Sequence, residues 1–102
     1  DGDDTILELE HTVPIEMAGS GAGALYVGPG WDGALMGLGL YLSGEMTPDP
    51  FAATNSTEAQ VFSKESVHAW TSVVETSGTA TADQIAAAAE VSLVQFAPDV
   101  GT

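Results

Sequence analysis

The side chains that could do chemistry are few in this sequence of 102 residues. It has two histidines, His11 and His68, and no cysteine. A zinc site needs three or four nitrogen, sulfur or carboxylate ligands around the ion, and no ligand-like spacing joins the two histidines. Ser66 and His68 would share one face of a strand without an acid to orient the imidazole, and the Gly-x-Ser-x-Gly turn of serine hydrolases is absent. We therefore expect no catalytic residue, no metal and no cofactor.

Three further patterns fit known sites only in part. The run Gly19–Ala24 satisfies the G-x-G-x-x-A dinucleotide fingerprint, but the chain is too short for the fold that uses it. The acids of Asp1–Asp4 are typical of the start of a calcium loop, yet Thr12 stands where that loop needs a glutamate. Glu8 and Glu10 could act as a glycosidase pair, but the pattern implies no pocket around them. We interpret all three as turns and solvated acids.

Two features bear on processing and modification. The sequence Asn55-Ser56-Thr57 satisfies the N-x-[ST] acceptor pattern in a predicted loop, so Asn55 is a possible glycosylation site if the protein is exported. The numbering begins at Asp1, which simple methionine removal would not leave. We favour proteolytic processing as its origin.

The charge balance excludes whole classes of partner. Fifteen acids and the single base Lys64 give a formal charge of −14. Nucleic-acid binding depends on many lysines and arginines that neutralise phosphates, and anionic membrane surfaces also attract basic segments. We therefore expect no nucleic acid as partner. Because no run of 18 apolar residues exists, we also expect no membrane insertion.

The excess of acidic over basic residues also indicates the salt concentration at which the chain is stable. Carboxylates that repel one another destabilise a compact chain at low ionic strength, and about 1 M salt shortens the Debye length to ~3 Å. Many acids, almost no lysine and many small residues together resemble the composition of proteins from extreme halophiles, above all haloarchaea and their viruses. The alternative is an ordinary acidic protein that binds a basic partner or Ca²⁺.

Alternating apolar residues predict strands in the first half of the chain. Over residues 5–17, apolar side chains fall at every second position, which is typical of a half-buried strand that Pro14 bends or breaks. Residues 24–27 predict a second short strand, and Gly28–Gly30 predicts a turn. Residues 34–43 alternate again, and each glycine there would cost a helix about 1 kcal/mol.

The second half of the chain contains the clearest helix signal. Residues 60–77 fit either a strand or a helix with Val67, Trp70 and Val74 on one face, and their β-branched content favours the strand. A hairpin turn would follow at 76–79, and 47–57 predicts a loop. Residues 81–90 carry a capping box before four alanines, which predicts a helix. That helix either gives way to a strand at 91–96 or continues through it.

Together these patterns predict a single domain over residues 1–102. We expect an α+β, β-rich fold with an antiparallel sheet or sandwich, one alanine-rich helix, and residues 1–17 as an N-terminal strand or arm for subunit contacts. The chain is then best explained as a structural subunit rather than an enzyme.

The expected function is assembly. We expect a coat, capsid-decoration, tail or surface subunit of a halophilic virus or haloarchaeon, located in the virion or at the cell surface and bound to other copies or to a larger protein assembly. A small acidic module that binds a cation, a sugar or a basic protein is the alternative. The residues expected at subunit contacts are Leu7, Leu9, Val13, Gly37, Gly39 and Tyr41.

Overall fold

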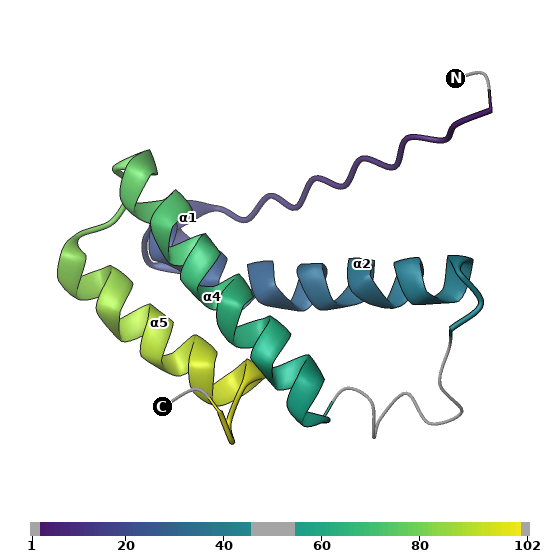
Figure 1. The fold of residues 1–102 in the computed structure, drawn as a ribbon. Coiled ribbons are helices and arrows are strands. Elements are labelled where there is room, and N and C mark those ends of the chain that lie inside the picture. The colour runs from purple at the N-terminus through teal and green to yellow at the C-terminus, as the bar shows by residue number, and fades with distance from the viewer. Residues whose placement is uncertain (1–2, 46–54, 101–102) are drawn as a thin grey trace.

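The computed structural model describes residues 3–45 and 55–100 (Figure 1). Its elements are α1 (Ile15–Ala18), the 3-10 helix η1 (Gly21–Tyr26), α2 (Gly28–Leu42), α4 (Thr57–Ser77) and α5 (Ala82–Phe96). These two ranges contain no strand. The predicted β-rich α+β fold, with its antiparallel sheet or sandwich, is therefore wrong, and the described chain is α-helical.

The core lies where α4 and α5 pack on each other and on η1 (Figure 1). Its buried apolar side chains are Ala22, Leu25, Val67, Val74, Ile85 and Ala88. The hydroxyl of Ser92, which is fully buried on α5, donates to the backbone oxygen of Leu25 at 2.6 Å. A buried hydroxyl needs such a partner, so this bond fixes α5 against η1.

The strand preferred for residues 60–77 is wrong, and the helical alternative is confirmed. Val67 and Val74 are buried and Trp70 is half-buried on the inner face of α4. Strand propensities differ by only about 1 kcal/mol across residue types, so burial against η1 and α5 decides the conformation. The N-terminal cap is Ser56, whose side chain accepts from the backbone of Ala59 at 3.2 Å.

The capping-box helix is confirmed and is longer than expected. Thr81 and Gln84 exchange the two side-chain-to-backbone bonds of the box, at 2.9 and 3.1 Å. The helix continues to Phe96, so the strand at 91–96 is wrong and the alternative, a helix that continues through these residues, is confirmed. Gly78, with φ of +70°, ends α4 and replaces the hairpin turn that was predicted at 76–79.

The strand predicted over 34–43 is also wrong, because these residues belong to α2. The turn predicted at Gly28–Gly30 is the first turn of that helix, with Pro29 in a position where its missing N–H costs nothing. A Cβ on Gly28 would lie 2.4 Å from the Trp70 ring. Glycine is therefore required there, since it lets α2 begin directly against α4.

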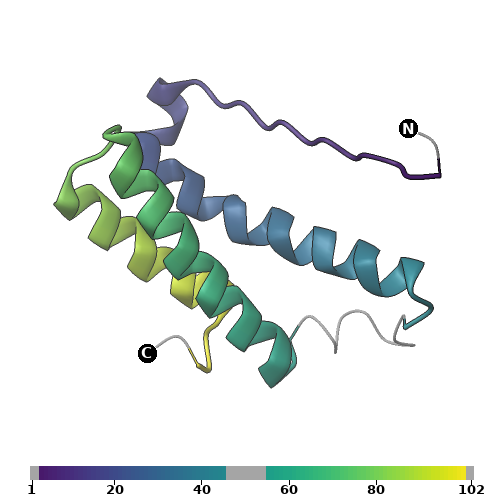
Figure 2. The ribbon, with the colours of Figure 1, turned by 45° about the horizontal axis from the view of Figure 1, so that its top comes forward.

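The N-terminal strand is replaced by an arm. Residues 3–14 form neither helix nor strand, and every one of them is exposed. The arm runs along the same side of α2 in two views (Figures 1 and 2). The prediction of a half-buried strand over 5–17 is wrong, because the described part of the chain offers no sheet for it to join. The short strand at 24–27 is also absent, since η1 occupies most of that span.

The predicted loop at 47–57 falls mostly outside the described residues. Its last residue, Thr57, begins α4.

Candidate functional site

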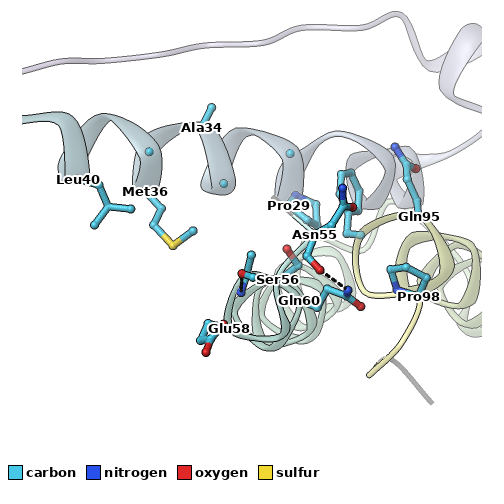
Figure 3. Close-up of a pocket in the computed structure, with 16 residues that line it drawn as sticks. Pro29, Ala34, Met36, Leu40, Asn55, Ser56, Glu58, Gln60, Gln95 and Pro98 are labelled. Carbon is cyan, nitrogen blue, oxygen red and sulfur yellow. Dashed lines mark hydrogen bonds between the residues drawn. The ribbon is translucent and has the colours of Figure 1, made fainter. Parts of the chain in front are cut away.

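An open groove lies between α2, the beginning of α4 and the end of α5 (Figure 3). It has a volume of about 670 Å³, which is within the range of small-molecule and peptide side-chain pockets. Met36 and Leu40 project from α2 toward the side where α4 begins (Figure 3). Phe96 and Pro98 line the groove from the C-terminal side. Its walls are thus mainly apolar.

The polar side chains at the groove include a buried amide that has a structural role. Gln60 is buried, and its Nε2 donates to the backbone oxygen of Asn55 and to Asp99 Oδ2, both at 3.0 Å. Its Oε1 accepts from the backbone N–H of Asp99 at 2.8 Å. These bonds tie the C-terminal segment to the start of α4, so Gln60 shapes the groove by holding its two walls together.

A second cluster joins α2 to α4. Asp32 Oδ2 accepts from the Ser66 hydroxyl at 2.6 Å and from Trp70 Nε1 at 2.8 Å. Hydrogen bonds to a carboxylate are roughly twice as strong as neutral ones. Ser66 is buried, so its hydroxyl is shielded from an external substrate. This arrangement acts as a clamp between two helices.

Asp32 was not among the candidate residues predicted from the sequence. Ser66 and His68 were paired there, but positions two apart lie on nearly opposite sides of a helix, and His68 is exposed while Ser66 is buried. No local signal could have paired Asp32 with a residue 34 positions away. The one relevant feature of the sequence is that Asp32 is the single charged residue between positions 28 and 42.

The arm contacts α2 through an aromatic pair. Trp31 Nε1 donates to His11 Nδ1 at 2.8 Å, and the two rings meet edge to face with centroids 5.8 Å apart. His11 therefore acts as a hydrogen-bond acceptor in this structure. The contact holds the middle of the arm at the start of α2.

One apolar stripe on α2 is exposed, and it stands on the side away from the groove. Its members are Trp31, Leu35, Leu38 and Leu42, spaced four, three and four residues apart. This spacing places them along one line of a helix. On the helical wheel, that line is about 150° from Gly33 and Gly37, which line the groove. The stripe is thus a second surface, distinct from the groove.

The structure divides the residues that were predicted at subunit contacts. Leu7, Leu9 and Val13 lie exposed on the arm. Gly37 lines the groove and exposed Tyr41 lies near it on the wheel. Gly39 lies on the opposite side of α2 from Gly37. The single strand face that would have carried Gly37, Gly39 and Tyr41 therefore does not exist.

The remaining sequence motifs have simple positions. Asn55 is exposed, immediately before the cap of α4, so the possible glycosylation site lies at the surface. Within residues 3–45 and 55–100, no three or more histidines and acids come together as a metal site would require. None of the helices in those ranges combines the length and apolarity needed to cross a membrane.

Comparisons with models of protein families, with curated proteins and with solved structures found no match to this chain.

Proposed function

We propose that this protein is a non-catalytic structural subunit that assembles with other copies of itself, or with a larger protein assembly, at high salt. The setting that best fits its composition is a coat, capsid-decoration, tail or surface layer of a halophilic virus or haloarchaeon. One observation carries the proposal. Large apolar side chains stay exposed along the arm and α2, on a chain that otherwise has a strongly acidic surface.

The amount of exposed surface supports a partner. The chain exposes 7137 Å², while a compact monomer of 10.4 kDa exposes about 5400 Å². Its radius of gyration is 15.1 Å, compared with about 12.8 Å for a compact domain of this length. Contiguous apolar patches of this kind are typical of interaction surfaces.

The arm is the element that depends most on a partner. Ile6 is 83% exposed and Leu7 is 63% exposed, and fully burying each such side chain would contribute about 1.5–3 kcal/mol. The arm forms neither helix nor strand, so it can lie along a neighbouring subunit. The described residues offer no sheet edge, so we expect the arm to contact helices of the neighbouring subunit rather than to extend a sheet.

Salt sets the condition for assembly. Two chains of charge −14 repel each other at low ionic strength, and the repulsion is largely screened at molar salt. The apolar contribution to assembly is not weakened by that screening. Assembly should therefore strengthen as salt increases, which is opposite to the behaviour of a complex with a basic partner.

Sedimentation of the whole chain at 10–200 μM in 0.1, 1 and 3 M KCl, together with helicity from circular dichroism, tests the proposal. We expect a folded oligomer at 3 M and dissociation or loss of helix at 0.1 M. A strictly monomeric, folded chain at 200 μM in 3 M KCl would contradict assembly with other copies of itself.

A matched pair of arm variants separates apolar contact from charge. Leu7→Gln with Leu9→Gln should weaken the oligomer at 3 M KCl. Glu8→Gln with Glu10→Gln changes the alternate positions of the same arm, and should leave the oligomer intact or strengthen it at lower salt. The arm proposal is wrong if both pairs behave alike.

A binding module is the second candidate function, and the groove favours it. Because its walls are mainly apolar, the groove suits an apolar side chain better than a cation or a sugar. A basic partner would bind the acidic surface outside the groove, and titration with poly-lysine at 50 mM KCl tests for it. Saturable binding there, by a chain that stays monomeric at 3 M KCl, would favour this function over assembly.

A further inference from the structure

We propose that the exposed stripe of α2 is the site of self-association, where it packs antiparallel against the same stripe of a second copy of this chain. This inference rests on the proposed assembly function and names the surface that performs it. Its residues are Trp31, Leu35, Leu38 and Leu42.

The pattern of the stripe fits a copy of itself. A spacing of four, three and four residues is the seam of a helix pair, in which side chains of one helix insert between those of the other. Leu42 is 74% exposed and Leu38 is 39% exposed, so this end of the seam is open, while Trp31 at the other end contacts His11 of the arm. Tryptophan and leucine at the same seam supply large apolar area with few polar atoms.

Charge selects the partner. From residue 33 to residue 44 the chain has no charged side chain, and Asp32 is engaged by Ser66 and Trp70 on α4. Two chains this acidic can approach closely only through a surface that lacks carboxylates. A basic protein would be drawn to the acidic surface elsewhere, so the uncharged face of α2 suits another copy.

The exposed area is sufficient for such a dimer. The chain exposes about 1700 Å² more than a compact monomer of its mass. A stable interface needs about 800 Å² from each partner. The surplus of the whole chain is thus about as large as the area that two partners together bury in one interface of ordinary size.

Electrostatics favours the antiparallel orientation. The first half of α2 packs on the rest of the molecule, whereas every residue from 37 to 45 is exposed. Antiparallel pairing places the rest of each acidic chain at opposite ends of the helix pair, whereas parallel pairing would place the two side by side. It also brings opposite ends of the two helix dipoles together. In this arrangement Leu35 faces Leu38 of the second copy, and Trp31 faces Leu42 once the arm has left its contact with Trp31.

Substitution in the stripe tests the surface. By sedimentation at 3 M KCl, Leu38→Asp should raise the dimer dissociation constant at least about 100-fold, because each dimer would bury two unpaired carboxylates. Leu38→Gln adds no charge and should raise it about 10-fold. Val61→Asp is the matched control, since Val61 is 45% exposed on α4, and should change it less than about threefold. Helicity checks that each variant folds.

Cross-linking tests the orientation, because the natural chain contains no cysteine. Residues 31 and 42 are about 16 Å apart along a helix, well beyond the ~7 Å limit between Cα atoms of a disulfide. Antiparallel pairing therefore predicts that an oxidised mixture of Trp31→Cys and Leu42→Cys chains forms the mixed disulfide. Leu42→Cys alone should form none. Cross-linking of Leu42→Cys alone would overturn the antiparallel arrangement.

The outcomes separate this inference from the function on which it rests. An oligomer that forms in the wild type and is unchanged by Leu38→Asp and Leu38→Gln overturns the α2 interface and leaves the assembly function standing. A wild-type chain that remains monomeric at 3 M KCl overturns both the α2 interface and self-assembly as the function.

Discussion

Replacing Asp32 by asparagine should destabilise the fold even though it removes a negative charge from a very acidic chain. Asp32 Oδ2 accepts bonds from the Ser66 hydroxyl and from Trp70 Nε1. A hydrogen bond to a charged group contributes about 1.5–3 kcal/mol, and a neutral one about 0.5–1.5 kcal/mol. Asparagine keeps one oxygen acceptor, so each bond weakens by about 1 kcal/mol, and we expect a loss of about 2 kcal/mol in total.

The control replaces a carboxylate that lies away from the contact between α2 and α4. Glu90 is exposed on α5, and Glu90→Gln removes the same charge without touching the contact between α2 and α4. Relief of repulsion should leave this variant unchanged, or stabilise it by a few tenths of a kcal/mol at low salt. Only Asp32→Asn is thus expected to lower the free energy of unfolding.

Urea unfolding in 2 M KCl, followed by circular dichroism at a fixed protein concentration, measures both variants. A double-mutant cycle with Ser66→Ala isolates the direct interaction, and the two substitutions should couple by at least about 0.5 kcal/mol. Equal stability of Asp32→Asn and Glu90→Gln would refute the clamp, and so would additive effects of Asp32→Asn and Ser66→Ala.

Three further substitutions probe the packing, each by the same urea titration. Gly28→Ala should cost about 1–3 kcal/mol, because the new Cβ would overlap the Trp70 ring; an unchanged midpoint would show that α2 can begin elsewhere. Ser92→Ala should cost about 1–3 kcal/mol, since it leaves the backbone oxygen of Leu25 buried without its hydroxyl donor, and Ser92→Thr should be less harmful if the bond matters more than the volume. Thr81→Ala should cost about 1 kcal/mol through loss of the cap of α5, whereas Thr81→Ser should restore most of it.

The α5 helix shows what local sequence can determine. Thr81, Gln84 and the alanines between Ile85 and Glu90 all favour a helix and its first turn, and the structure has both. These signals act within a few residues, through side-chain bonds to the adjacent backbone and the low entropy cost of alanine. Nothing distant is needed to interpret them.

The α2 helix shows the opposite case. Its residues satisfy a period of two from Ala34 to Leu42 and a helical period from Trp31 to Leu42, so the pattern alone allowed either conformation. The glycines made a strand the better local choice. The prediction was wrong because it weighed the helix cost of Gly37 and Gly39 without the contacts between α2 and α4.

The candidate sites divide in the same way. Leu7, Leu9 and Val13 are exposed on an arm outside any sheet, which differs from the half-buried strand that was predicted. The groove could not have been anticipated, since it joins residues from both halves of the chain. The residues of the α2 stripe are spaced four, three and four positions apart in the sequence, which fits a helix. The strand was predicted instead because apolar residues in the same segment also alternate.

By itself, then, the sequence determined the net charge, the lack of basic residues and cysteine, and the capped helix α5, because each is a property of composition or of neighbouring residues. Only the tertiary structure decided that α2 and α4 are helices and that Asp32 joins them. The reason is physical: both segments were close to balance between two backbone conformations. Hydrogen bonds and apolar contacts between residues more than 30 positions apart supplied the few kcal/mol that selected one of them.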